Sequence, residues 1–123
     1  MHVKRYVFGN EKFLNEVEKR AVLIVKALKS VKGLLISTID GLPVISVGNF
    51  KEASKIASIS AAFAQLSRLT GQILGEDKGY IEAKFNSMSI AIFPFKTAVF
   101  LAILDKDGNP DEIKKMIEKL FKE

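Results

Sequence analysis

Residues 33–47 read GLLISTIDGLPVISV, which is two short β-forming runs on either side of Asp40-Gly41. An Asp-Gly pair favours a tight hairpin turn because glycine tolerates the positive φ that such a turn requires. Pro43 stands early in the second run, and its missing N–H is tolerated best on an edge strand. We therefore expect a β-hairpin here, with its second strand at the edge of a sheet.

A helix is expected on each side of this hairpin. The first spans about residues 10–32, with Asn10 as its cap and Gly33 as its end, and its apolar residues fall within one arc. These apolar residues are Phe13, Leu14, Val17, Ala21, Ile24, Val25, Leu28 and Val31. The second helix spans Lys51–Leu74 and ends before Gly75. Its expected buried stripe consists of Ala53, Ile56, Ile59, Ser60, Phe63, Ala64, Ser67, Gly71 and Leu74.

The remaining third of the chain predicts three strands and a short helix. The strands are Tyr80–Phe85, Met88–Phe93 and the nearly continuous apolar run Thr97–Leu104, which is typical of a central strand covered on both faces. Pro110 suits the first position of the last helix. The order α-β-β-α-β-β-β-α predicts one α+β domain over residues 1–123, with a mostly antiparallel five-stranded sheet and helices on both faces.

Composition excludes several classes of protein. The 123 residues are 48% hydrophobic, which suits one folded domain and not a disordered chain. The longest apolar run, Ala98–Leu104, is far below the ~18–20 residues of a membrane-spanning helix. Residues 1–10 show no secretory signal, and the lack of cysteine excludes disulfides and thiolate sites. We expect a cytoplasmic protein.

The net charge of +5 is concentrated at the N-terminus. Residues 1–32 hold eight basic and three acidic side chains, whereas the rest of the chain is balanced. A basic helix can attract acidic proteins, nucleic acid or an anionic membrane surface, or it can simply be a solvated face. Aromatic residues do not alternate with these charges, so we expect no nucleic-acid partner. Weak contact between the basic first helix and a membrane surface stays open.

The residues needed for common enzyme chemistry do not occur together. His2 is the only histidine, stands in a terminus expected to be mobile, and has no partner for a triad or a metal pair. The sequence contains neither G-x-x-x-x-G-K-[ST] nor G-x-G-x-x-G, the glycine-rich motifs that bind nucleotide phosphates. Asp105, Asp107 and Asn109 resemble the start of a calcium loop, but Pro110 and Met116 occupy positions that need Gly and Glu. We predict no catalytic residue, cofactor or metal.

The second helix carries an arc that is poor in charge for so charged a chain. It consists of Lys51, Ser54, Ser58, Ala61, Ala62, Gln65, Arg68, Leu69 and Gln72. Small, neutral side chains let another backbone approach and are easily desolvated, so we interpret this arc as a partner-binding face. The alternative is an ordinary alanine-rich helix. Arg68 fits an interface anchor better than an arginine finger.

The strand of residues 80–85 is a second candidate interface. At a sheet edge it could pair with its own copy across a two-fold axis. Pairing centred on Ala83 would place Glu82 opposite Lys84 of the second copy, twice. The expected dimer interface is Tyr80, Ile81, Glu82, Ala83, Lys84 and Phe85. The alternative is that Glu82 and Lys84 are charges on a solvated edge.

These features resemble the roadblock / dynein light-chain domain family. The residues that carry the resemblance are Gly33–Ile36, Asp40–Val44, Ala57–Ala62, Phe93-Pro94 and Leu101–Leu104. The resemblance implies a non-enzymatic dimer in which the third strand and second helix of each subunit meet to form a shared sheet under paired helices. It also implies binding or regulation of a Ras-like small GTPase through the second-helix arc. A scaffold that recruits proteins without nucleotide dependence, and a heterodimer with a related chain, remain alternatives.

Overall fold

The computed structural model describes residues 1–76 and 79–121, which form three helices and six strands. In chain order the elements are β1 (Val3–Arg5), α1 (Glu11–Ala27), β2 (Val31–Thr38), β3 (Pro43–Val47), α2 (Ala53–Leu74), β4 (Ile81–Lys84), β5 (Met88–Pro94), β6 (Ala98–Asp105) and α3 (Pro110–Leu120). Within the described residues the strands form one sheet in the order β1-β3-β2-β6-β5-β4, and every pairing is antiparallel. The α+β class is confirmed, and the expected five strands become six.

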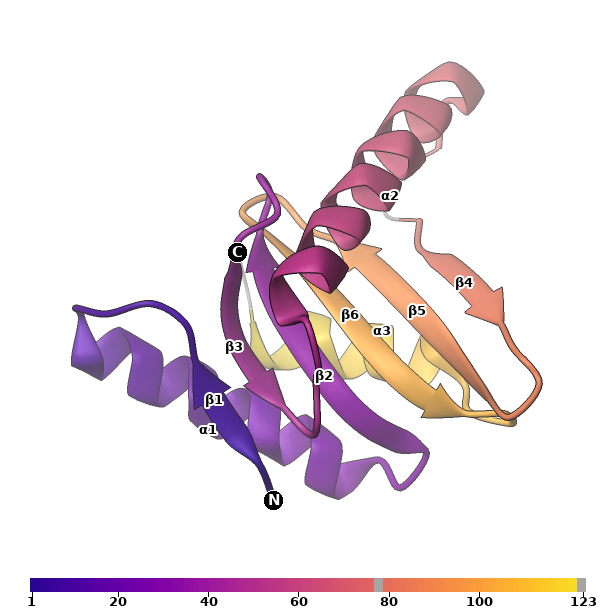
Figure 1. The fold of residues 1–123 in the computed structure, drawn as a ribbon. Coiled ribbons are helices and arrows are strands. Elements are labelled where there is room, and N and C mark those ends of the chain that lie inside the picture. Colours follow the sequence, from indigo (N-terminus) through magenta and orange to yellow (C-terminus); the bar gives the residue numbers. More distant parts are fainter. Residues whose placement is uncertain (77–78, 122–123) are drawn as a thin grey trace.

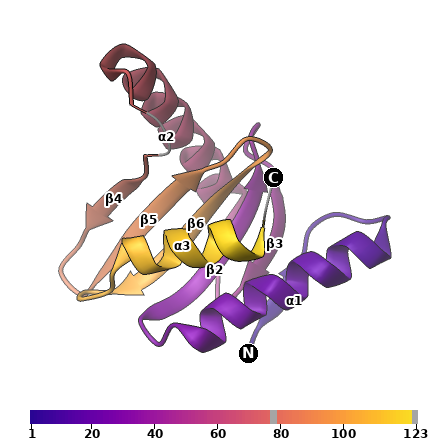
Figure 2. The same ribbon diagram turned by 180° about the vertical axis from the view of Figure 1, so that it is seen from behind.

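The sheet is covered on both faces, as expected. Helix α2 crosses one face, while α1 and α3 lie side by side on the other (Figures 1 and 2). Alternate residues of the central strand β6 supply both layers. Val99 and Leu101 pack under α2, and Phe100, Ala102 and Leu104 pack under α1 and α3. The prediction of a central strand over this apolar run is therefore confirmed.

The hairpin of β2 and β3 forms where its sequence predicts. Thr38 N–H donates to the Leu42 carbonyl at 2.8 Å, and Gly41 lies in the turn with φ +91°. A Cβ on Gly41 would lie 3.0 Å from the Cα of Ser58 in α2. Glycine is thus needed here both for its backbone conformation and because the turn rests against α2.

The N-terminus differs from the prediction. Residues expected to be mobile form β1, which pairs with β3 through Val3–Val47, Lys4–Ser46 and Arg5–Ile45. Strand β3 is therefore not at the edge. Pro43 is tolerated because it is the first residue of β3: its pairing with Ser37 of β2 lies beyond a shift in register, and the pairing with β1 begins two residues later.

Helix α1 is shorter than the sequence predicts. Asn10 caps it as expected, its side chain accepting from Phe13 N–H, but the helix ends at Ala27 and not near Gly33. Val31 already belongs to β2, where it pairs with Leu104 of β6. Pairing with the central strand outweighs the helical spacing of Val31, because a β-branched residue packs well in a sheet.

Candidate protein-interaction surface

Helix α2 carries two parallel seams of side chains, each with the 4-3-4-3 spacing of a coiled coil. The sheet-facing seam is Ala53, Ala57, Ser60, Ala64 and Ser67. The first four of these are buried, and Ser67 is half-buried. The outward seam is Ile59, Phe63, Leu66, Thr70 and Ile73. All five of its members are exposed.

The expected buried stripe of α2 is therefore only partly right. Ala53, Ser60 and Ala64 face the sheet, but Ile59, Phe63 and Leu74 are 52%, 40% and 69% exposed. Small residues allow the helix backbone to lie close to the sheet, so the larger ones turn outward. Two interleaved heptads, one of small and one of large residues, are visible in the sequence and mark the two candidate faces, but their spacing is the same and does not say which face meets the sheet.

The outward seam runs along the flank of α2 that leads to β4. Ser67 Oγ lies 3.8 Å from the position a Cβ would take on Gly79, two residues before β4. Phe63 and Thr70 stand four residues before and three residues after Ser67, so they share this flank. The large apolar side chains of the outward seam therefore lie on the side of α2 that is next to the β4 edge of the sheet.

Strand β4 lies at the edge of the sheet, which is the position that the proposed pairing with a second copy requires, and its one partner among the described strands is β5. Ile81 and Ala83 pair with Ile92 and Ile90, which belong to the layer under α2. Glu82 pairs with Ala91, which belongs to the opposite layer. The edge thus presents apolar side chains on the α2 face and charged ones on the other.

The two residues that flank β4 have different surroundings. The Tyr80 hydroxyl donates to Asp111 Oδ1 of α3 at 3.0 Å, and its ring packs 5.4 Å from that of Phe93. Burial, then the bond to Asp111, raise the pKa of Tyr80, so the phenol stays protonated at neutral pH. Phe85 at the other end is 55% exposed. Tyr80 therefore fastens β4 to α3, while Phe85 adds apolar surface at the edge.

The predicted partner-binding arc of α2 is mostly solvent-facing. Its exposed members are Ser54, Ser58, Ala62, Gln65, Leu69 and Gln72. Ala61 is half-buried, and Lys51 is exposed but precedes the first helical residue by two positions. The exposed members within the helix carry no charge, so this arc keeps the neutral character that the sequence indicates.

Arg68 does not point freely into solvent. Its Nη2 donates to the Phe95 carbonyl, in the turn between β5 and β6, at 2.6 Å, and the side chain is partly buried. This bond ties α2 to the sheet, because the Phe95 carbonyl follows the last residue of β5. Arg68 thus helps to hold the helix in place, and its role as an interface anchor stays a prediction.

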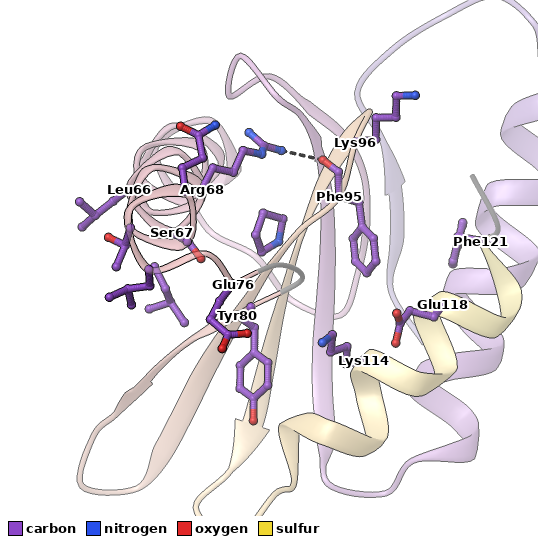
Figure 3. Close-up of a pocket in the computed structure, with 17 residues that line it drawn as sticks. Leu66, Ser67, Arg68, Glu76, Tyr80, Phe95, Lys96, Lys114, Glu118 and Phe121 are labelled. Atoms are coloured by element: carbon purple, nitrogen blue, oxygen red, sulfur yellow. Dashed lines mark hydrogen bonds between the residues drawn. The ribbon is translucent and has the colours of Figure 1, made fainter.

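A cleft of about 1060 Å³ lies beneath the C-terminal half of α2, between it, the start of β4 and α3 (Figure 3). Lys114 and Glu118 of α3 and Tyr80 line it together with Arg68. Charges of both signs meet there, and the protonated Tyr80 is a poor base. The described residues contain no group of three metal-ligating side chains, and none of their helices is long and apolar enough to span a membrane.

Comparison with known proteins gives matches in structure alone. No family model and no curated sequence matches the chain. The Roadblock/LC7 domain from Streptomyces avermitilis superposes with a TM-score of 0.71 at 12% identity, covering 83% of this chain and 88% of that one. MglB from Myxococcus xanthus superposes with a TM-score of 0.76 at 14% identity, covering 94% of this chain and 87% of that one. The gliding protein MglB from Thermus thermophilus superposes with a TM-score of 0.73 at 10% identity, covering 98% of this chain and 92% of that one. The resemblance to roadblock proteins is therefore confirmed at the level of the fold.

Proposed function

We propose that the chain is a homodimeric, non-enzymatic module that binds a small Ras-like GTPase and modulates its nucleotide cycle. The observation that carries the proposal is the outward seam of α2 beside an open, partly apolar β4 edge. An exposed heptad of Ile59, Phe63, Leu66 and Ile73 is too apolar to leave in water and has the spacing for pairing with a second helix. The roadblock fold supports the choice of partner.

The proposed dimer joins β4 to its copy across a two-fold axis. Pairing centred on Ala83 places Glu82 against Lys84 of the second copy on one face and Ile81 and Phe85 on the α2 face. The two outward seams then meet above the joined strands, because they lie on the flanks that lead to β4. The sheet continues through both subunits, and a closed two-fold contact covers the edges that would otherwise recruit further chains.

The GTPase would bind the exposed part of the predicted partner-binding arc on each of the paired helices, which we call the neutral arc. Ser54, Ser58, Gln65, Leu69 and Gln72 stay exposed after the outward seams meet, since they lie on a different side of each helix. A flat, neutral surface of two helices can hold the switch segments of a GTPase in one conformation by contacting it more favourably than the others. The module would change the partner's cycle without supplying a catalytic group.

Two neighbouring residues allow dimerisation and partner binding to be tested separately. Leu66 belongs to the outward seam and Gln65 to the neutral arc, and both are exposed. Leu66→Glu should convert the dimer into a monomer in light scattering, because two carboxylates would be buried against each other. Gln65→Glu introduces the same charge one position away and should leave the dimer intact. A dimer unaffected by Leu66→Glu would contradict the proposed seam.

The partner is tested by capture from a lysate with the tagged protein, in parallel with GDP and with a non-hydrolysable GTP analogue. We expect a small GTPase enriched in one nucleotide state, and we expect Gln65→Glu to reduce its recovery. Equal capture of other proteins in both states, with no GTPase among them, would favour a scaffold instead. Recovery of a related chain in place of a second copy would indicate a heterodimer.

A further inference from the structure

The acidic side chains of α1 are all engaged by two arginines. Arg5 of β1 reaches Glu11 and Glu18 at 2.9 Å each, and Arg20 lies 3.7 Å from Glu16. Arg5 also donates to Asn15 at 2.6 Å. The carboxylates that could neutralise the lysines of α1 are therefore already paired with other cations.

The lysines of α1 form a straight row on its solvent side. Lys12, Lys19 and Lys26 follow one another at intervals of seven residues, and all three are exposed. Seven residues are nearly two turns, so the row extends over ~21 Å along the helix. Lys29 is also exposed and stands two residues after the end of the helix. None of these four lysines makes an ion pair with any residue of the described ranges 1–76 and 79–121.

Apolar side chains stand exposed among these charges. Leu23 is 49% exposed and lies four residues after Lys19 and three before Lys26, which places it on the same side of the helix. Phe8, in the loop that precedes α1, is 97% exposed, and Phe13 in the first turn is 58% exposed. A basic face with exposed phenylalanine and leucine is typical of a helix that lies on a membrane surface.

The position of α1 leaves the surfaces of the proposed function uncovered. Helix α1 lies on the sheet face opposite α2, beneath the β1 and β3 end of the sheet, whereas β4 is at the other edge (Figures 1 and 2). Its neighbour α3 carries three acidic and three basic side chains, so α3 adds no net charge beside the lysine row. Contact through α1 therefore competes with neither the β4 edge nor the neutral arc.

We propose that α1 and the loop before it form a docking surface for an anionic lipid bilayer. The lysine row supplies charge complementarity to a layer of acidic headgroups, while Leu23 beside the row and Phe8 in the loop before the helix enter the boundary between headgroups and acyl chains. Nucleic acid fits this surface less well. Arginine, which matches phosphate best, occurs here only in ion pairs with carboxylates, and the exposed apolar side chains cannot donate hydrogen bonds. This inference does not depend on the proposed GTPase.

The test is co-sedimentation of the full chain with vesicles of phosphatidylcholine, alone or mixed with phosphatidylserine. We expect binding to the mixed vesicles only, falling steeply with added salt. The double variant Lys19→Glu with Lys26→Glu should bind the mixed vesicles at least about 25-fold more weakly, because each lysine lost costs roughly fivefold in affinity. The matched control reverses Lys51 and Lys55, two exposed lysines at the N-terminal end of α2 on the opposite face of the sheet, so its net charge is the same. It should keep its affinity within about twofold, since distant charges are screened.

Phe8→Ala separates insertion from charge attraction. It leaves the net charge unchanged and should weaken binding to the mixed vesicles by about tenfold, because an apolar side chain no longer leaves water. The proposal is overturned if the two lysine double variants lose equal affinity for the mixed vesicles, or if the wild-type chain does not bind these vesicles. It is also overturned if Phe8→Ala binds as tightly as the wild type. So would tighter binding to a DNA duplex than to the mixed vesicles under the same salt conditions.

Discussion

Helices α1 and α2 lie on opposite faces of the same sheet but distribute their side chains in opposite ways. Helix α1 buries Leu14, Val17 and Ile24 against the sheet and exposes mainly charged residues. Helix α2 buries alanine and serine and exposes the large apolar residues of its outward seam. The first pattern completes a hydrophobic core within the chain. The second pattern is completed only when another surface covers the helix, and this is the physical basis of the proposed dimer.

The largest expected effect compares one isoleucine from each helix. Ile24 is fully buried in the layer under α1, so Ile24→Ala should lower the free energy of unfolding by about 2–5 kcal/mol. Ile59→Ala removes the same atoms from an exposed position and should change the stability of the dilute monomer by less than about 0.5 kcal/mol. Urea denaturation at low and high protein concentration measures both. A large loss for Ile59→Ala at low concentration would mean that α2 is not exposed in the monomer.

A second comparison enlarges one residue in each seam of α2. Ala64 is fully buried against the sheet, so Ala64→Leu should overpack the layer and cost about 1–3 kcal/mol of folding stability. Thr70 is the polar member of the outward seam, so Thr70→Leu should instead strengthen the dimer by about 1–2 kcal/mol through added apolar contact. Thermal unfolding measures the first effect and sedimentation equilibrium the second. A dimer weakened by Thr70→Leu would contradict helix pairing through this seam.

The smallest expected effect concerns the register of the β4 edge. Lys84→Glu would place two carboxylates opposite each other twice in the proposed pairing, and each cross-strand pair is worth about 0.2–1 kcal/mol. The dimer dissociation constant should rise severalfold in sedimentation equilibrium. Adding Glu82→Lys restores opposite charges and should return the constant toward the wild-type value. If the double variant dimerises no better than the single one, the pairing is not centred on Ala83.

Local patterns were reliable where a short stretch of sequence has one physical solution. Asp40-Gly41 predicted the hairpin turn, and Asn10 and Pro110 predicted helix starts that the structure confirms. For residues 80–85 the sequence predicted a strand but left its edge position conditional, and the structure places β4 at the edge. The strand β1 was missed, since three residues carry no periodicity, and its place depends on pairing with β3 and on the contacts of Arg5 with α1.

The sequence by itself determined the type of every element except β1, the central position of β6 and the neutral character of the arc on α2. Only the tertiary structure decided which face of α2 meets the sheet, where α1 ends and what Arg68 does. Both seams of α2 repeat with helical spacing, so periodicity cannot choose between them. The choice depends on how closely the helix backbone approaches the sheet, which small side chains permit and large ones prevent. Arg68 is likewise interpreted from sequence as a surface charge, because its partner, the Phe95 carbonyl, reaches it only in the folded chain.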